Sequence, residues 1–262
     1  MNESDRWVRE ERQGAVATLT IDRPNALNAL NQDVLGQLRE SVDAIASDAT
    51  VRAMVLPGAG TKAFVAGADI VAMSTMRADE AMRYAEQGHA LMDAIEAMPQ
   101  PVIAAVNGFA LGGGCELALA CDLIYASQNA RFGQPEVKLG LMPGFGGAAR
   151  LPRKIGQAAA AEWIYTGEMY SAEQARDVGL VRAVLPGDEL LPHCLKIATT
   201  IASRAPLAVS ASKQVLVRGG RVGGLEAASM ERDSFARLFA TEDMREGTKA
   251  FVEKREPSFK GA

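Results

Sequence analysis

The sequence predicts a mixed α/β core followed by an all-helical C-terminal region. Short apolar runs alternate with segments of helical period in the first part of the chain, and glycine and proline clusters separate them. Beyond about Pro206 only helical patterns rich in Ala, Met, Arg and Glu remain. We therefore expect an α/β core over residues 1–200 and a helical region over residues 201–262.

The first elements read as a hairpin, a helix and a strand. Residues Trp7–Glu11 and Ala15–Asp22 alternate in polarity around a glycine, which predicts two antiparallel strands. Asn31 is a good N-cap for a helix with an apolar stripe, formed by Val34, Leu35, Leu38, Val42 and Ile45. Val51–Leu56 is an apolar run that ends at a Pro-Gly pair, so we expect a short buried strand.

A glycine-containing loop, Lys62–Asp69, leads into helical segments that reach Met98. Asp69 has the position of an N-cap residue. The core stripe of these helices consists of Leu91, Met92, Ile95 and Met98.

The centre of the chain predicts strand, glycine turn, helix and strand in close succession. The strands are residues 102–106 and Leu123–Ala126, and the helix ends near Cys121. After Phe132 the pattern is largely helical, with one further strand at Val181–Leu185. Periodicity does not determine the strand order.

The glycine turn has the layout of an active site. Glycines between a strand and a helix permit close approach, and the first N–H groups of a helix lack partners inside it. Such N–H groups at the positive end of a helix dipole favour an anion or a developing oxyanion. Glu116 follows Gly113 by three residues, so its carboxylate projects from the same face.

This turn is compatible with two other interpretations. A Glu at the third helical position is often the return arm of a capping box. A strand, glycine turn and helix also suggest a dinucleotide-binding fold, but Leu117 occupies the place of the third glycine of that motif. The dinucleotide interpretation is therefore disfavoured.

Two further loops carry candidate site residues. Ala68 precedes the helix that Asp69 caps, so its N–H is a candidate second donor. Pro135 disfavours helix around it, which predicts that Glu136 lies on a turn. Two glutamates on glycine-rich turns and two free amide donors form a more specific combination than any one of them.

Composition excludes several classes of function. A net charge of −4 argues against nucleic acid or an anionic membrane as the main partner. No apolar run approaches the roughly 20 residues that span a bilayer. The chain shows no zinc-protease, nucleophile-elbow or Walker motif, so we expect no metal site and no serine nucleophile.

Localisation follows from the cysteines and the N-terminus. Cys115, Cys121 and Cys194 are odd in number and form no C-x-x-C pair, so we expect reduced, buried thiols in a cytoplasmic protein. The polar segment Met1–Arg6 is unlike a signal or transit peptide.

Together, several segments make the chain resemble the enoyl-CoA hydratase/isomerase (crotonase) superfamily nearly end to end. The segments are Asp22–Asn28, Ala63–Asp69, Asn107–Glu116, Phe132–Glu136, Pro143–Gly147 and Ala250–Arg255. The resemblance implies a spiral of β-β-α turns, a C-terminal helical trimerisation region, and a homotrimer or a homohexamer built as a dimer of trimers.

The resemblance also implies roles for individual residues. The Ala68 and Gly113 amides correspond to the oxyanion hole for the thioester carbonyl, and Glu116 and Glu136 correspond to the paired catalytic carboxylates.

Four more positions correspond to substrate contacts of the family. Ala66 matches the adenine-recognition position, and Gly144 lies where a backbone group helps to place the water. Phe251 and Lys254 resemble a pair that reaches the CoA of a neighbouring subunit.

The chain also departs from the family. Members often carry lysines where this chain has Asn25 and Val71, which puts those contacts with CoA phosphates in doubt. Many members read Thr-Gln where this chain has Ala148-Ala149.

Both glutamates being present favours an enoyl-CoA hydratase that adds water reversibly to a short or branched 2-enoyl-CoA. The resemblance implies no metal or redox cofactor, because CoA arrives as part of the substrate. The alternatives are a Δ3-Δ2-enoyl-CoA isomerase and a methylglutaconyl-CoA-type hydratase; a non-catalytic RNA-binding scaffold fits the acidic balance poorly. The acyl pocket would be lined by Ile70–Arg83 and residues near Leu141 and Phe145, whose spacing carries no code for the acyl chain.

The apolar stripes of the C-terminal helices predict an oligomer independently. One tail offers little core to cover them, so we expect partner subunits to do so. The stripes include Leu225, Met230, Phe235, Leu238 and Phe239.

Overall fold

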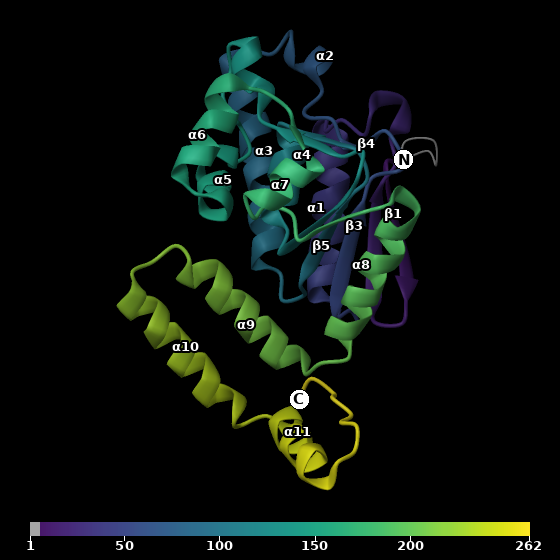
Figure 1. The fold of residues 1–262 in the computed structure, drawn as a ribbon, viewed down its shortest axis with the longest axis vertical. Helices are drawn as coiled ribbons and strands as arrows, with labels where there is room; N and C mark the ends of the chain where they lie inside the picture. The colour runs from purple at the N-terminus through teal and green to yellow at the C-terminus, as the bar shows by residue number, and fades with distance from the viewer. Residues whose placement is uncertain (1–5) are drawn as a thin grey trace.

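The structure is a computed structural model, and it describes residues 6–262. Its core contains two sheets (Figure 1). The larger sheet has the order β1 (Val8–Gln13), β2 (Val16–Ile21), β3 (Ala53–Pro57), β5 (Val102–Val106), β7 (Leu123–Ser127) and β10 (Ala183–Leu185). The smaller sheet has the order β4 (Ala63–Val65), β6 (Phe109–Leu111), β8 (Arg131–Gly133) and β9 (Tyr170–Ser171).

The chain winds as a spiral between these sheets. Strands β3, β5 and β7 pair in parallel in the larger sheet, and the strands that follow each of them, β4, β6 and β8, pair in parallel in the smaller one. Each turn therefore adds one strand to each sheet and then a helical segment, in chain order. Among the strand pairs within residues 6–262, only the hairpin β1–β2 and the pair β8–β9 are antiparallel.

Helices cover both faces of the larger sheet. On one face, the main apolar core includes buried side chains of α1 (Gln32–Ser47), α3 (Ala78–Ala97) and α4 (Gly113–Ala120). On the other, α8 (Gly187–Ala202) packs Leu190, Cys194 and Ala198 against Val55 and Ile103. Strands covered on both faces are apolar throughout, and every residue of β3 and β5 is buried.

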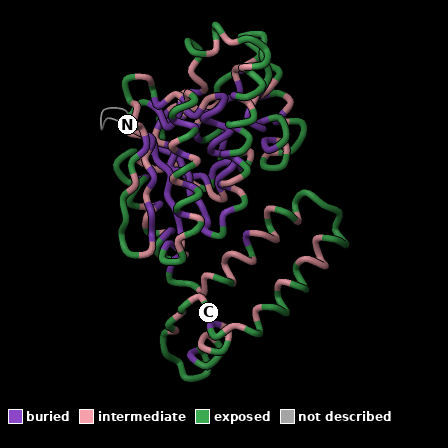
Figure 2. The backbone as a smooth tube through the Cα atoms, turned by 180° about the vertical axis from the view of Figure 1, so that it is seen from behind, coloured by how far each residue is buried: buried purple, intermediate pink, exposed green. Residues whose placement is uncertain are grey.

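The last three helices extend away from this core (Figure 1). They are α9 (Pro206–Gly219), α10 (Gly224–Leu238) and α11 (Glu242–Glu253). Figure 2 shows few buried residues along them, in contrast to the core. Lys213 links α9 to the core. Its side chain is 3% exposed, and its ammonium donates to the Ile95 and Gln100 carbonyls and pairs with Asp122 at 2.9 Å.

The predicted mixed α/β class with a helical C-terminal region is confirmed, as are the hairpin and the strand at 102–106. Asn31 caps α1 by accepting from Val34 N–H at 2.9 Å, and the predicted stripe of α1 is buried. The strands expected at 51–56 and 181–185 each begin two residues later, at Ala53 and Ala183.

The expectation that one strand follows Phe132 was wrong, because β9 pairs with β8 at residues 170–171. Strands β6 and β8 were also missed, as was β4, which lies in the segment expected to be a loop. All four are only two or three residues long, so they offer no alternation to detect. The N-terminal segment that argued against a signal peptide lies outside the described residues except for Arg6. Within residues 6–262 no helix has the length and apolarity needed to cross a bilayer.

Candidate active site

Glu116 lies on the first turn of α4 and is 1% exposed. Its Oε1 accepts hydrogen bonds from Phe145 N–H at 2.8 Å and Gly147 N–H at 2.7 Å. The side chain therefore faces a distant loop and does not cap its own helix, so the capping-box interpretation is excluded. Burial raises the pKa of Glu116, while the two backbone donors oppose that shift by favouring the carboxylate.

Glu136 lies on a single turn of 3-10 helix, η3 (Pro135–Leu139). We expected Pro135 to disfavour helix around it and to leave Glu136 on a turn. The turn is helical, because Pro135 occupies the first helical position, where its missing N–H costs nothing. The carboxylate reaches the glycine turn: a Cβ built on Gly112 would lie 2.8 Å from Glu136 Oε1. Burial raises the pKa of Glu136 to about 7, and the charge of Glu116 acts in the same direction.

Gln134 lies between the two carboxylates and is buried. With its amide nitrogen facing Glu136, it donates to Oε1 at 3.1 Å and Oε2 at 3.3 Å. A Cβ built on Gly147 would lie 2.7 Å from the other atom of this amide, which is the oxygen in this orientation, and 3.0 Å from Glu116 Oε1. The structure thus brings Glu116 and Glu136 together around one amide side chain.

The Ala68 and Gly113 amides lie side by side next to these carboxylates. A Cβ on Gly113 would be 3.5 Å from Ala68 N. A parallel bridge joins Leu30 to Ala68, through Leu30 N–H to Gly67 O and Asp69 N–H to Leu30 O, both 2.9 Å long. In that pattern the Ala68 N–H points away from Leu30.

Gly113 is the first residue of α4, so its N–H has no acceptor within the helix. Among residues 6–262, no carbonyl or side chain accepts a hydrogen bond from the Ala68 or Gly113 N–H. Two unpaired N–H groups in a largely buried position suit an oxygen that gains negative charge.

Glycine is required where the two segments meet. A Cβ at Gly114 would lie 1.9 Å from the Val65 carbonyl oxygen, so only glycine lets α4 begin against β4. Gly112 has φ +48° and Gly67 has φ +123°, conformations that side chains rarely adopt.

Asp69 and Asn28 fix the loops on either side of Ala68. Asp69 caps α2 (Ile70–Met73) as predicted, accepting from Ala72 N–H, and it also pairs with Arg23 at 2.9 Å. Asn28 is fully buried, and its amide donates to the carbonyls of Ala59 at 3.0 Å and Ala63 at 2.9 Å. The sequence offered Asn28 only as part of a motif, without this role.

Arg150 holds the loop that supplies the donors to Glu116. Its guanidinium is 6% exposed, donates to Phe145 O at 3.0 Å, and pairs with Asp93 and Glu96. The loop residue Phe145 is therefore bound through its carbonyl to Arg150 and through its N–H to Glu116. The backbone donors of Phe145 and Gly147 were missed in the sequence, because their acceptor, Glu116, lies about thirty residues away along the chain. Gln134 belongs to the Phe132–Glu136 motif, but no role was predicted for it from the sequence.

The remaining predicted contacts divide into two groups. Ala66 is next to the site, where its N–H donates to Leu27 O at 3.0 Å, and Gly144 directly precedes Phe145, with open space where a Cβ would be. Phe251 is 86% exposed and Lys254 ends α11 with φ +54°. Helix α11 lies at the opposite end of the molecule from α2 and α4 (Figure 1), so the chain does not bring these two residues to its own carboxylates.

The positions that depart from the family are all exposed. Val71 is 83% exposed on α2, and Asn25 is exposed on the turn before α1. Ala148 and Ala149 are exposed on α5 (Gly147–Ile155), the helix that also carries Arg150.

The three cysteines are free and buried, as expected. Cys115 adjoins Glu116 and is 0% exposed. Burial raises the pKa of its thiol far above the ordinary value, so it is not a thiolate at neutral pH.

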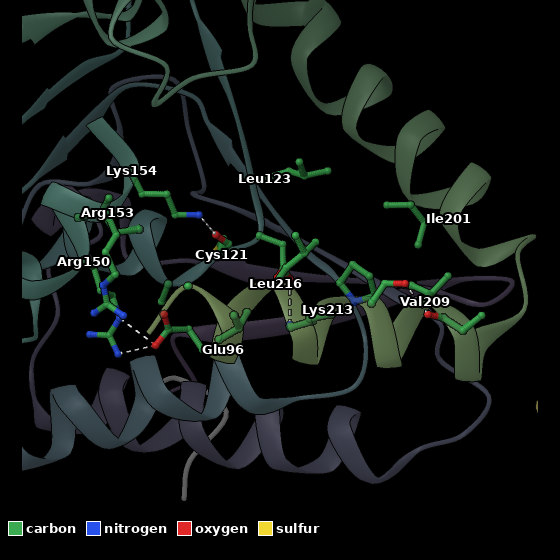
Figure 3. Close-up of a pocket in the computed structure, with 18 of the residues that line it drawn as sticks. Glu96, Cys121, Leu123, Arg150, Arg153, Lys154, Ile201, Val209, Lys213 and Leu216 are labelled. Atoms are coloured by element: carbon green, nitrogen blue, oxygen red, sulfur yellow. Dashed lines mark hydrogen bonds and ion pairs between the residues drawn. The ribbon is translucent and has the colours of Figure 1, made fainter. Parts of the chain in front are cut away.

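A separate cavity of about 760 Å³ lies between α9 and the carboxyl end of α4 (Figure 3). Its lining includes Lys154, Lys213, Leu123 and Leu216. Helix α4 rises about 12 Å over its eight residues, which separates this cavity from the glycine turn. The paired carboxylates do not line it.

The chain is similar to known enzymes over almost its whole length. The profile of the enoyl-CoA hydratase/isomerase family matches residues 11–262. A crotonyl-CoA hydratase of Syntrophomonas wolfei is 47% identical over 95% of this chain and 96% of the relative. A short-chain-enoyl-CoA hydratase of Clostridium acetobutylicum is 46% identical over 94% of each protein.

Solved structures agree. The enoyl-CoA hydratase of Bacillus anthracis superposes with a TM-score of 0.96 at 38% identity, covering 98% of this chain and 100% of that one. The crotonase fold, the hydratase branch and the hydro-lyase class are thereby confirmed. The chain belongs to the enoyl-CoA hydratase/isomerase family.

Proposed function

We propose that this protein hydrates short-chain 2-enoyl-CoA thioesters reversibly, with Glu116 and Glu136 as its acid and base and the Ala68 and Gly113 amides as its oxyanion hole. One observation carries the proposal: two unpaired N–H groups adjoin the buried carboxylate of Glu116 and the half-buried one of Glu136 in a single small volume.

The two amides stabilise the negative charge that forms during hydration. Attack of water on C3 moves electrons through C2 to the thioester oxygen, which becomes an enolate oxygen. Two fixed N–H donors stabilise that oxygen in a site with little water, and loss of one such donor costs about 10²–10³-fold in rate.

The carboxylates divide the proton transfers. Glu116 accepts two backbone N–H bonds, which favour its ionised form, so we assign it as the base that takes a proton from water. Glu136, whose pKa is raised to about 7, supplies the proton to C2. In the reverse reaction the two groups exchange tasks.

The environment of the expected acyl pocket supports a short, uncharged chain. Arg77 and Arg83 are the cations that would meet a distal carboxylate, and both pair with Asp79, at 3.2 and 3.1 Å. Named relatives include a crotonyl-CoA hydratase, and also a 2,3-dehydroadipyl-CoA hydratase of Escherichia coli at 44% identity. The paired arginines favour the first substrate over a dicarboxylic or methylglutaconyl-type one.

The proposal includes CoA binding across subunits. Ala66 and Gly144 would contact the substrate within the chain, while Phe251 and Lys254 would reach the CoA of a neighbour in a homotrimer or homohexamer. The many exposed apolar side chains of α9–α11 support this assembly. Light scattering should give a mass of three or six chains; the mass of one chain would refute it.

We assign no metal or redox cofactor to the reaction, with CoA entering as part of the substrate. The three free, buried cysteines support the cytoplasm as its location.

A substrate panel tests the function. Straight, branched and dicarboxylic 2-enoyl-CoAs are each incubated with the protein while the absorbance of the conjugated thioester is followed. We expect crotonyl-CoA to be hydrated fastest. A 3-enoyl-CoA that gains conjugation without forming hydroxyacyl-CoA would instead indicate the isomerase, and fastest turnover of a dicarboxylic substrate would refute the short-chain assignment.

A further inference from the structure

An aromatic pair, Tyr84 and Phe145, connects parts of the site that come from different turns of the spiral. The ring centroids are 5.1 Å apart and the planes meet at 80°, an edge-to-face contact. Both residues are 4% exposed. Neither was assigned to the reaction above.

Phe145 touches both the base and one oxyanion donor. Its N–H donates to Glu116 Oε1 at 2.8 Å, and a Cβ on Gly113 would lie 3.1 Å from its ring atom Cε2. The position of this ring therefore affects the orientation of Glu116 and the start of α4 together.

Tyr84 is connected to the other oxyanion donor, Ala68, through Leu30. Its hydroxyl donates to the Leu30 carbonyl at 2.5 Å. The same carbonyl accepts from Asp69 N–H, within the bridge that leaves the Ala68 N–H pointing away from Leu30. Burial raises the pKa of Tyr84 above its ordinary value, so the hydroxyl remains a protonated donor.

Gly88 makes room for this pair. It lies in α3, one turn after Tyr84, and a Cβ there would be 2.1 Å from Phe145 Cδ1. A glycine inside a helix is destabilising relative to alanine. The Phe145 ring explains why α3 carries a glycine at this point.

We propose that Tyr84 is a positioning residue for hydration: its hydroxyl on Leu30 and its ring against Phe145 fix the spacing of the Ala68 and Gly113 N–H groups and the orientation of Glu116. This inference rests on the proposed function of the site. Tyr84 acts through other residues and transfers no proton itself.

The sharpest test is Tyr84→Phe, which removes the bond to Leu30 and keeps the ring. With crotonyl-CoA, we expect kcat to fall roughly tenfold and KM to change less than twofold, because small displacements of donors weaken the transition state more than the bound substrate. The matched control is Tyr165→Phe, since Tyr165 is 75% exposed on α6 (Gln157–Thr166).

A second measurement reports on the oxyanion hole without turnover. Bound 3-oxobutanoyl-CoA enolises to a species with its own near-ultraviolet absorbance, and the enolised fraction rises with the strength of the two N–H donors. Tyr84→Phe should lower that fraction several-fold, while Tyr165→Phe should leave it unchanged.

A glycine pair tests the connection to Glu116. Gly88→Ala displaces the Phe145 ring and weakens the hydrogen bond from Phe145 N–H to Glu116. The pKa of Glu116 should then rise, and the acid limb of the pH profile of kcat/KM should shift to higher pH by roughly half a unit. Gly36→Ala is the control, because Gly36 lies in helix α1 with nothing within 4 Å of a built Cβ.

Wild-type kcat together with a wild-type enolised fraction in Tyr84→Phe would overturn the inference. So would a lower melting temperature with an unchanged enolised fraction, which would make Tyr84 merely structural. If the unmodified protein fails to hydrate crotonyl-CoA, the proposed function falls, and the enolised fraction still decides the role of Tyr84.

Discussion

The region around the glycine turn and the C-terminal helices differ in how far their predicted functional side chains are exposed. Glu116 is 1% exposed and both its pKa and its orientation depend on backbone groups of the same chain. On the C-terminal helices, Leu225 is 92% and Phe251 86% exposed. The first region is complete within one chain, whereas the second presents apolar surface of the kind that a partner covers.

This difference separates two kinds of variant. Changes at the turn should alter the chemical step and leave assembly unaffected. Changes in the tail should alter substrate affinity or assembly and leave the chemical step unaffected.

The largest effect should come from Gly113→Pro, which deletes one oxyanion donor. Proline is tolerated at the first position of a helix, so α4 itself can form. We expect loss of about 10³-fold or more in kcat, measured with crotonyl-CoA, from the missing N–H and the local displacement.

Gly113→Ala is the control for Gly113→Pro. It retains the N–H and adds a Cβ 3.1 Å from Phe145, so it should lose much less activity. Circular dichroism must show the native fold in both variants. A folded, active Gly113→Pro protein would contradict the oxyanion assignment.

Glu116→Gln and Glu136→Gln should each lower kcat by about 10²-fold or more, because an amide keeps the shape and cannot exchange protons. Affinity for a CoA thioester, measured by calorimetry, should change little. Near-normal hydration by either variant would show that the paired-carboxylate mechanism is wrong.

Glu136→Gln should also change how stability depends on pH. The folded pKa of about 7 lies above the usual 4.5, so the folded state holds this proton more tightly than the unfolded state. Stability from this group is present below pH 4.5 and is lost as the pH rises through 7.

Glu136→Gln has no carboxyl group to titrate, so this loss of stability with rising pH does not occur in the variant. In thermal melts, the free energy of unfolding of Glu136→Gln should therefore rise relative to that of the wild type between pH 4.5 and 8. We expect a rise of roughly 1 kcal/mol, after allowance for solvent around a half-buried group. A constant difference across this range would contradict the raised pKa.

The smallest effect should come from the tail. Lys254→Ala should weaken CoA-thioester binding by roughly 1 kcal/mol, more at low salt than at high salt, because an exposed ammonium acts as a screened point charge. Calorimetry at two ionic strengths measures this, and light scattering should show the same mass as the wild type. Unchanged, salt-independent binding would refute the contact between subunits.

Sequence patterns predicted those parts of the fold that have a period. The stripe of α1 and the strand at 102–106 were found because their apolar residues repeat at helical or strand spacing. Strands β4, β6, β8 and β9 were missed because two or three residues cannot display a period. The turn at Pro135 was predicted and is a 3-10 helix, since proline excludes the interior of a helix and not its start.

The candidate site was predictable only in part for a related reason. Gly113 and Glu116 lie close together in one local pattern of turn and helix start, and Asp69 lies in another such pattern. The donors that hold Glu116 come from Phe145 and Gly147, about thirty residues later, where a backbone N–H is the same for every residue type.

The spiral order of the strands has a consequence for how the site comes into being. Ala68, Gly113 and Glu136 belong to three successive turns of the chain, each stacked on the one before. A nascent chain has no site until the third turn has been synthesised and docked. In the mature protein, transient detachment of any one turn disassembles the whole constellation, so the activity reports on the least stable of three stacked layers before global unfolding begins.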